Sequence, residues 1–292
     1  MKLKIQARAK INWTLDVVGT LPNGYHDLDM LMQSVTLCDQ MTMEEAPQLS
    51  LYVRAQGRAF VPADGNNLVL KAAAALQAAT GCTRGARITL KKYIPVAAGM
   101  GGGSSDAAAA LVGLNRLWGL GLSADRLEEI GLTVGADVPF CIKKGTAVAR
   151  GIGEMLESCA PMPDCAVVVA IPKGSRICTA DAYGKIDDVR ESAPVSCADM
   201  LAAMTSCDLE RISSVLYNKF EKVTDPATGV PELLARLSEI GASGVRMSGS
   251  GPAVFGLFRD IPAARAAKEK LGESFTSFVC SPARRDYPYI ES

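Results

Sequence analysis

A glycine-rich segment near the middle of the chain has the composition of a phosphate-binding loop. Residues 95–106 read PVAAGMGGGSSD and are followed by AAAALVGL, so the segment leaves a predicted strand and enters a predicted helix. Glycines at four of five successive positions let a ligand approach the backbone and permit positive φ angles. The N–H groups of such a loop and of the helix start attract anions. We therefore predict phosphate binding, against the alternative of a flexible linker in which Ser104 only caps the helix.

The best-known nucleotide-binding patterns do not describe this segment. It lacks the GxxxxGK[ST] spacing of a Walker A loop, and it lacks the βαβ setting in which GxGxxG binds dinucleotides. A second glycine-rich segment, MSGSGP at residues 247–252, precedes a predicted strand. That segment fits a second anion-facing loop and a tight β turn equally well. Phosphate binding by a different loop architecture is the expectation.

Three titratable residues have surroundings that fit either a catalytic or a structural role. Lys10 lies at the end of an alternating strand in ARAKINW, where burying an ammonium group without a partner is costly. Asp137 lies in GADVPF, between a predicted helix and a predicted buried strand, where a turn-forming role is the alternative. His26 follows NGY and is the single histidine of the chain, which excludes a multi-histidine metal site. Its ring could bind a ligand, or it could be structural.

The elements around these residues predict an α+β fold. Strands are expected at residues 2–8, 13–18, 28–37, 49–54, 86–92, 167–171, 253–258 and 277–280. Helices are expected at residues 67–79, 104–118, 123–133, 198–205, 209–223, 231–240 and 262–271. The order does not alternate strictly as βαβ, which argues against a doubly wound sheet. The length of 292 residues and a Gly/Pro-rich stretch at 151–163 indicate two domains, residues 1–155 and 156–292.

Composition excludes several classes of protein. Lysine plus arginine number 31, as do aspartate plus glutamate, so nothing favours a nucleic-acid partner. No apolar run approaches the roughly 20 residues that span a bilayer, and the N-terminus resembles no export or transit leader. We expect a soluble bacterial cytoplasmic protein, monomeric or homodimeric. The nine cysteines form no CxxC pair and are expected to be reduced, mainly buried thiols.

The two glycine-rich segments resemble motifs of the GHMP superfamily of galactokinases, homoserine kinases, mevalonate kinases and phosphomevalonate kinases. PVAAGMGGGSSDAA resembles its central phosphate motif, with Met100 in place of the more usual leucine, and MSGSGPAVFGLF resembles its C-terminal glycine motif. AKINWTLDVVGTLPNGYHDLDMLMQSV and GLTVGADVPFCIKKGTAVARGIGE resemble a narrower branch. Kinases of that branch phosphorylate the 2-hydroxyl of a cytidine diphosphate-linked methylerythritol in the non-mevalonate isoprenoid pathway. The similarity covers roughly residues 4–156 and 243–258.

The resemblance implies an N-terminal nucleotide-binding domain, a C-terminal ferredoxin-like α+β domain, and a reaction that uses ATP and Mg²⁺. It implies that Asp137 accepts the hydroxyl proton while Lys10 orients it and steadies negative charge. The implied ATP-binding positions are Asn67, Lys92, Val96, Ala97, Ala98, Gly99, Met100, Gly101, Gly102, Gly103, Ser104, Ser105 and Asp106. The implied substrate-binding positions are Asn12, Tyr25 and His26 at the cytidine end, Thr179 near the diphosphate, and Gly249, Ser250 and Gly251 from the second domain.

Two alternatives remain on sequence grounds. Another GHMP kinase, acting on homoserine, mevalonate or a sugar, would share both glycine motifs but not the NGYH segment in this form. A non-catalytic nucleotide-binding protein on the same fold would be favoured by loss of Lys10 or Asp137, and both are present. No acidic ligand for magnesium can be named from the sequence.

Overall fold

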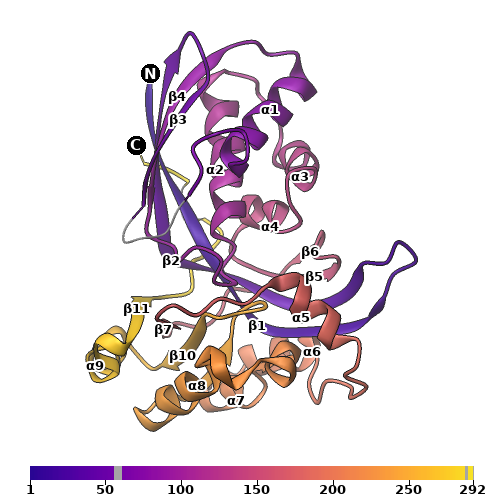
Figure 1. Cartoon of the computed structure of the whole chain (residues 1–292), viewed down its shortest axis with the longest axis vertical. Helices are drawn as coiled ribbons and strands as arrows, with labels where there is room; N and C mark the ends of the chain where they lie inside the picture. Colours follow the sequence, from indigo (N-terminus) through magenta and orange to yellow (C-terminus); the bar gives the residue numbers. More distant parts are fainter. Residues whose placement is uncertain (56–60, 287–288, 292) are drawn as a thin grey trace.

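The computed structural model describes residues 1–55, 61–286 and 289–291, and its strands form two sheets, one above the other in Figure 1. The first sheet has eight strands, with the order β12-β1-β2-β4-β3 and with β5, β6 and β8 attached to its side. Its strands are β1 (Lys2–Thr20), β2 (His26–Ala46), β3 (Ser50–Ala55), β4 (Gly85–Lys92), β5 (Thr146–Gly151), β6 (Met155–Ser158), β8 (Tyr217–Asn218) and β12 (Ile290–Glu291).

Two long antiparallel strands, β1 and β2, form a ribbon that runs through the molecule. Its hairpin end projects to the right in Figure 1, away from the helices of the first domain. The sequence predicts two strands where β1 is one, because the polar residues 10 and 12 interrupt the apolar pattern. The pairing register shifts between Arg8 and Lys10 and again between Asn12 and Thr14. Such bulges redirect side chains, so this stretch of β1 is shaped to present residues to a site.

Four helices cover one face of the first sheet: α1 (Leu68–Thr80), α2 (Gly102–Leu117), α3 (Ala124–Leu132) and α4 (Val138–Lys143). The predicted helix at 67–79 is confirmed as α1, with Asn67 as its N-cap and Gly81 ending it at φ 69°. Helix α2 packs against β1 and β2 through the buried run Ala107–Ala110, because small side chains allow close approach. This packing fixes the start of α2, and with it the predicted phosphate loop, against the sheet.

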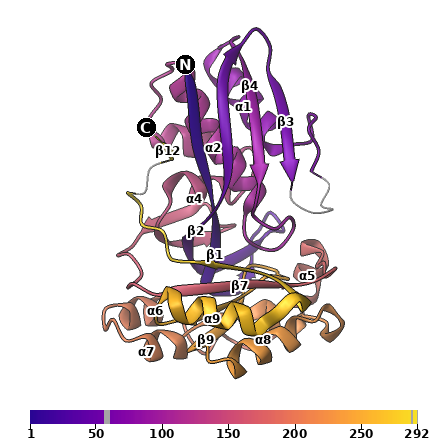
Figure 2. The same cartoon turned by 90° about the vertical axis from the view of Figure 1, so that its left-hand side faces the viewer.

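The second sheet has the ferredoxin-like topology that the resemblance implies. Its strands are β7 (Ala166–Pro172), β9 (Gly244–Met247), β10 (Val254–Phe258) and β11 (Phe275–Cys280), in the order β11-β7-β10-β9 with every pairing antiparallel. Helix α8 (Val230–Glu239) is the last helix of the long connection from β7 to β9, and α9 (Ile261–Leu271) connects β10 to β11. The two helices lie side by side across the sheet in Figure 2. The expected α+β fold with two domains is confirmed.

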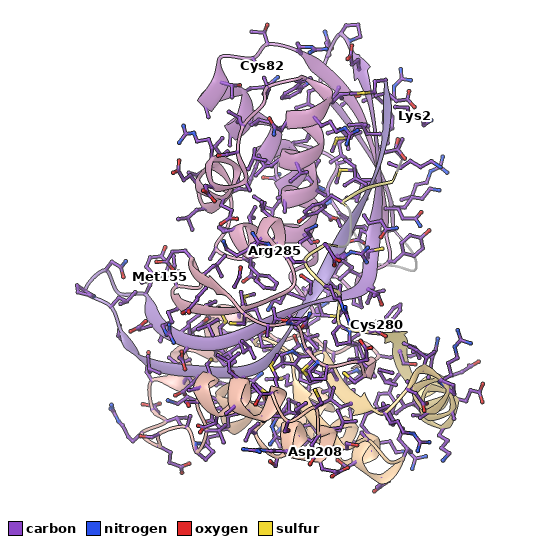
Figure 3. The ribbon with its side chains drawn as sticks, turned by 180° about the vertical axis from the view of Figure 1, so that it is seen from behind. Lys2, Cys82, Met155, Asp208, Cys280 and Arg285 are labelled. Atoms are coloured by element: carbon purple, nitrogen blue, oxygen red, sulfur yellow. The ribbon has the colours of Figure 1, made fainter. Side chains whose placement is uncertain are left out.

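One apolar core joins the two domains. Trp13 of the ribbon packs edge-on against Phe255 of β10, with ring centroids 5.4 Å apart. Buried residues of β7 and of helices α6 (Cys197–Met204) and α7 (Leu209–Ser214) complete this core. Cys280, labelled in Figure 3, belongs to the same core at the junction of the domains. The shared core holds the C-terminal glycine motif at a fixed place relative to the ribbon.

Two further sequence-based assignments are wrong. The helix predicted at 209–223 is α7, then the short strand β8 beside β1, then a 3₁₀ helix at Lys219–Val223. The helical pattern is interrupted at Asn218. Its side chain accepts from the backbone N–H of Phe220 and donates to two carbonyls of the C-terminal glycine motif. The buried strand predicted after Asp137 is helix α4, since a short apolar run fits either element. Helix α5 (Thr179–Ile186) and strands β5, β6 and β9 had no sequence-based assignment.

The first sheet also takes strands from beyond residue 155. β6 extends to Ser158, and the end of the chain returns as β12 to pair with β1. The boundary between residues 155 and 156 therefore stays a prediction. Short 3₁₀ helices lie at Pro226–Thr228 and Gly272–Ser274.

The nine cysteines are free thiols, of which four are buried, three are half-buried and two are exposed. Within the described residues, no helix is both long and apolar enough to cross a membrane.

Candidate active site

The predicted phosphate loop lies between the end of β4 and the start of α2, beside a cavity of about 350 Å³. Its backbone is left-handed at Gly99 (φ 77°) and Gly101 (φ 65°), which glycine adopts without strain. Gly101 is the N-cap of the 16-residue helix α2, and no side chain caps the first N–H groups of that helix. The loop therefore offers an anion the N–H groups and the positive dipole end of α2. The cavity is lined by Val61, Pro62, Asn66, Asn67, Leu68, Lys92, residues 95–104 and Asp106.

Lys10 and Asp137, far apart in the sequence, meet beside this loop. Lys10 lies on β1 between the two bulges, and Asp137 lies immediately before α4. The Nζ of Lys10 is 3.9 Å from Oδ2 of Asp137. A Cβ added to Gly101 would lie 3.0 Å from Cγ of Lys10 and 3.6 Å from Oδ2 of Asp137, so the pair touches the loop. The Lys10 side chain is buried at 7% exposure, whereas that of Asp137 is open to a ligand at 33%.

Asn12 holds Lys10 in place. Its Oδ1 accepts from Nζ of Lys10 at 3.0 Å and from the backbone N–H of Gly249 at 3.1 Å. Its side chain is completely buried. The structure therefore places Asn12 with Lys10 and the C-terminal glycine motif, and not beside Tyr25 at the far end of the predicted substrate site.

The C-terminal glycine motif packs directly on the phosphate loop. The Ser248 hydroxyl donates to the carbonyl of Gly99 at 3.0 Å, and the N–H of Ala253 donates to the carbonyl of Ala98 at 3.1 Å. A Cβ added to Gly99 would lie 2.1 Å from the carbonyl oxygen of Ser248. The two glycine-rich segments thus form one backbone-to-backbone contact between the domains.

A second cavity, of about 300 Å³, opens next to the Lys10–Asp137 pair. It is lined by Lys10, Leu15, Leu28, Met30, Gly99, Gly101, Ser104, Ala136, Asp137, Ile152, Thr179, Tyr183, Phe220, Gly249 and Ser250. The hydroxyl of Thr179 lies 2.9 Å from that of Ser250, so α5 and the glycine motif meet at its wall. Ser104 lines both this cavity and the one beside the phosphate loop. The two cavities therefore share a border where a phosphoryl group could pass between ligands.

An aromatic group not singled out from the sequence completes the far end of this cavity. Tyr183 packs edge-on against Phe220 at 4.9 Å, and the ring of His26 lies 4.6 Å from that of Tyr183. Burial, and then the negative charge of Asp137, raise the pKa of Tyr183 to about 12. The Nε2 of His26 lies 2.9 Å from Oδ1 of Asp187. Tyr25 is 61% exposed, in the turn that joins β1 to β2.

Sequence reasoning missed Tyr183 because its helix is short and no motif marks it. The available signal was its position four residues after Thr179, on the same side of a helix. Among the predicted residues near the adenine, Asn67 uses both ends of its amide, accepting from Val69 N–H and donating to the Pro62 carbonyl. Ser105 also faces inward, donating to the Arg8 carbonyl.

The described side chains form no cluster of metal ligands that could hold Mg²⁺ without the nucleotide. Within the described residues, no group of three or more His, Cys, Asp or Glu side chains could hold a metal ion. Mg²⁺ in phosphoryl-transfer sites is bound largely by water and by the phosphates of the nucleotide. A magnesium ion would therefore be held mainly by water and by the phosphates of the nucleotide, and it would neutralise phosphate charge beside the loop.

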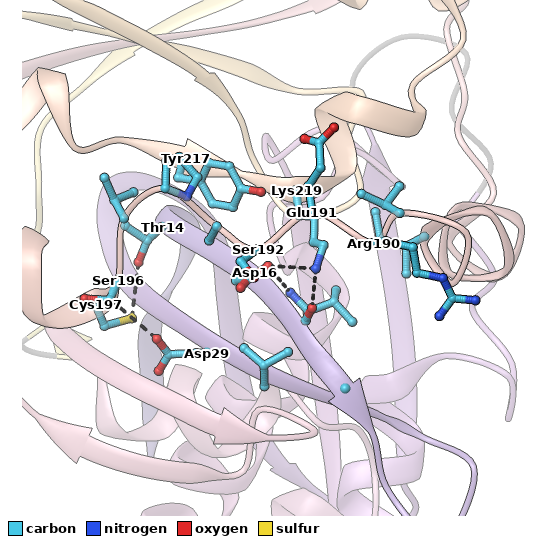
Figure 4. A pocket seen from close by; sticks show the side chains of 18 of the residues that line it. Thr14, Asp16, Asp29, Arg190, Glu191, Ser192, Ser196, Cys197, Tyr217 and Lys219 are labelled. Atoms are coloured by element: carbon cyan, nitrogen blue, oxygen red, sulfur yellow. Dashed lines mark hydrogen bonds and ion pairs between the residues drawn. The ribbon is translucent and has the colours of Figure 1, made fainter.

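A larger cavity lies on the other face of the ribbon and has no predicted site residue in its wall. It measures about 630 Å³ and is shown in Figure 4. Two of its charged groups are paired with each other: Lys219 contacts Asp16 at 3.2 Å and also donates to the Val17 carbonyl. Asp29 pairs with Arg150 at 3.2 Å. Lys10, Asp137 and the phosphate loop line instead the two cavities described above.

Comparison with known proteins identifies the family of the chain. The family model of the GHMP kinases N terminal domain matches residues 67–145, and that of the GHMP kinases C terminal matches residues 200–277. A 4-diphosphocytidyl-2-C-methyl-D-erythritol kinase of Exiguobacterium sibiricum is 45% identical over 258 residues, which is 88% of this chain and 89% of the relative. The corresponding kinase of Alkaliphilus metalliredigens is 37% identical over 98% of this chain and 99% of its own length.

Solved structures give the same answer for the fold. The crystal structure of a 4-(cytidine 5'-diphospho)-2C-methyl-D-erythritol kinase superposes with a TM-score of 0.81 and 32% identity, covering 95% of this chain and 98% of that one. A mevalonate kinase from L. major, solved with R-mevalonate, superposes with a TM-score of 0.75 at 16% identity, which shows the shared fold alone. The chain belongs to the 4-diphosphocytidyl-2-C-methyl-D-erythritol kinase family of the GHMP kinases.

Proposed function

We propose that this chain transfers the γ-phosphoryl group of ATP to the 2-hydroxyl of 4-diphosphocytidyl-2-C-methyl-D-erythritol, a step of the non-mevalonate route to isoprenoid precursors. Membership of the GHMP kinases implies the use of ATP. The observation that carries the proposal is the contact of the Lys10–Asp137 pair with Gly101 of the phosphate loop. An acceptor in the cavity of Thr179 and Tyr183 would therefore meet a phosphoryl donor at the loop.

Asp137 is proposed to be the base. Its carboxylate is partly exposed and makes no cap hydrogen bond to α4, so an oxygen is available to a ligand hydroxyl. As the hydroxyl oxygen bonds to the γ-phosphorus, its proton passes to Asp137 and the bond from that phosphorus to the bridging oxygen breaks. General-base assistance of this kind is worth about 10²–10⁴-fold, and positioning with charge stabilisation supplies the rest.

Lys10 is proposed to orient Asp137 and to balance negative charge. Its ammonium group is held by Asn12, which is in turn fixed by the N–H of Gly249. An ammonium group that is already positioned needs no reorganisation when charge develops on the transferring group. The contact with Gly249 makes this geometry depend on the second domain.

The cytidine end of the substrate is proposed to lie against His26 and Tyr183. An ionised carboxylate only accepts hydrogen bonds, so the contact with Asp187 puts the proton of the neutral imidazole on Nε2. Nδ1 is then an acceptor, which matches the exocyclic amino group of cytosine. The aromatic faces of Tyr183 and Tyr25 offer a stacking surface for the base.

The proposal is tested by the choice of acceptor. ADP release from MgATP is measured with 4-diphosphocytidyl-2-C-methyl-D-erythritol, and in parallel with galactose, homoserine and mevalonate. Turnover is expected with the cytidyl substrate alone. Turnover with another acceptor only would show that the chain is a kinase but would refute the cytidyl compound as its acceptor.

His26→Ala tests the cytidine end separately. The variant should raise KM for the cytidyl substrate about tenfold, because one hydrogen bond and one stacked ring are lost. The KM for ATP should change little, since His26 does not line the cavity of the phosphate loop. Tyr52→Ala is a control that removes a 58% exposed ring from β3. An unchanged KM for the cytidyl substrate in His26→Ala would remove His26 from the binding site.

A further inference from the structure

A buried group of one ammonium and two carboxylates lies beneath the phosphate loop. Lys92 ends β4, Asp39 belongs to β2 and Asp106 belongs to α2. Their exposed fractions are 5%, 0% and 3%. The Nζ of Lys92 donates to Oδ2 of Asp106 at 2.6 Å and also to Oδ2 of Asp39. We call these three residues the loop anchor.

The two carboxylates of the loop anchor have very different hydrogen-bond partners. Oδ1 of Asp39 accepts from the backbone N–H groups of Tyr93 and Ile94, in addition to the bond that Lys92 donates to Oδ2. Asp106 accepts only from Lys92, and its Oδ1 is buried without a hydrogen-bond partner among the described residues. Donors stabilise an ionised carboxylate, and a buried ionised oxygen without one is costly. The arrangement therefore suits a charged Asp39 but not a charged Asp106.

The place of the loop anchor gives its charge a functional meaning. Lys92 and Asp106 line the cavity of the phosphate loop, and a Cβ added to Gly102 would lie 3.4 Å from Nζ of Lys92. With both carboxylates ionised, the anchor would carry a net negative charge beneath a site for phosphates. Like charges in a buried setting repel strongly, which would oppose nucleotide binding. With one proton on the carboxylate pair, the anchor is neutral.

We propose that Asp106 carries a proton, so that Lys92, Asp39 and Asp106 form a charge-neutral anchor that positions the phosphate loop without repelling its anion. The anchor joins β2, the end of β4 and α2, which are the elements on both sides of the loop. A protonated Asp106 becomes a donor, and Asp39 is the carboxylate that shares the ammonium group of Lys92 with it. Asp39 and Asp106 are thus positioning residues. The part concerning the anion rests on the proposed function, while the proton on Asp106 does not.

The ionisation behaviour of the group supports this assignment. Burial is the main cause that raises the pKa of Asp106 well above its usual value, Lys92 opposes the rise, and the charge of Asp39 adds to it. Burial alone would lower the pKa of Lys92, but the two carboxylates outweigh burial and raise it. When Asp106 is neutral, Lys92 still donates to Oδ2 of Asp39, whose other oxygen is held by two backbone N–H groups, so the ammonium group keeps an ionised partner.

Amide substitutions separate the two carboxylates. Asp106→Asn replaces a protonated carboxyl by a neutral group of the same shape that can still donate, so the melting temperature should stay within about 2 °C of the parent. Asp39→Asn removes the ionised acceptor of Lys92 and of two N–H groups, so a fall of roughly 6–12 °C is expected. Asp164→Asn, at a side chain that is 93% exposed, is the matched surface control.

Two further measurements read the proton and the loop directly. The infrared difference between aspartate-labelled and unlabelled protein, both without nucleotide, should contain the band of a protonated carboxyl group. The band should be lost in Asp106→Asn and kept in Asp164→Asn. Binding of MgATP, measured by calorimetry, should weaken at least tenfold more in Asp39→Asn than in Asp106→Asn.

Three results would overturn the proposal. The carboxyl band could be absent from the parent protein, or Asp106→Asn could destabilise the protein as much as Asp39→Asn. Alternatively, Asp106→Asn could abolish the magnesium dependence of ATP binding, which would make Asp106 an ionised metal ligand. A parent protein that shows the band but binds no ATP would instead contradict the proposed function, so the two failures can be told apart.

Discussion

Asp137→Asn should lower kcat for the cytidyl substrate by about 10²–10⁴-fold. Asparagine keeps the shape of the side chain but cannot accept the hydroxyl proton, so the loss falls on the chemical step. Nucleotide affinity should change little, because the cavity of the phosphate loop does not include Asp137 in its wall. Steady-state kinetics for both substrates, together with calorimetric binding of ATP, separates the two effects.

The matched control for this variant is Asp125→Asn, at an exposed aspartate in the first turn of α3. It makes the same chemical change away from the site and should leave kcat at the parent value. A second comparison is Lys10→Met, which leaves Asp137 without its neighbouring ammonium group. If Asp137→Asn retains turnover within threefold of the parent, or changes only KM, Asp137 is not the base.

The sequence was informative where the conformational freedom of glycine defines a site, as it does in the phosphate loop. Glycines between a strand and a helix predicted the phosphate loop, and the structure places positive φ angles and an uncapped helix start there. Lys10 and Asp137 were ambiguous from their own neighbours. Their pairing depends on the bulges of β1 and on the position of α4, and family resemblance supplied what local spacing could not.

The parts that the sequence did not reveal depend on contacts between distant elements. Tyr183 becomes part of the site because α5 packs against the 3₁₀ helix of Phe220 and because the ring of Tyr183 contacts that of His26 on β2. No sequence motif surrounds Asp39. Its role depends on β4 and α2, which bring Lys92 and Asp106 to it in the folded chain. The same reason explains the wrong helix at 209–223, where the bonds from Asn218 to the glycine motif outweigh local helix propensity.

Gly99→Ala is expected to have a large effect on both stability and turnover. A methyl group at this position would lie 2.1 Å from the carbonyl oxygen of Ser248 and 3.1 Å from the N of Gly251. Both neighbours are backbone atoms, so no side-chain rotation relieves the clash and the two loops must separate. Left-handed strain and overpacking together should lower the free energy of unfolding by about 2–5 kcal/mol. Denaturant melts and kcat measurements at saturating substrate read the two effects.

Gly119→Ala isolates the clash from the strain. Gly119 has a similar φ of 66° but nothing within 4 Å of an added Cβ, so only the left-handed penalty of about 1–2 kcal/mol applies. Because Gly119 follows α2 at the end remote from the phosphate loop, kcat should stay at the parent value. A fall in kcat confined to Gly99→Ala would mean that the contact between the glycine-rich segments sets the position of Lys10, through Gly249 and Asn12. Equal losses of stability in both variants, with kcat retained in both, would mean that the contact between the domains is dispensable for turnover.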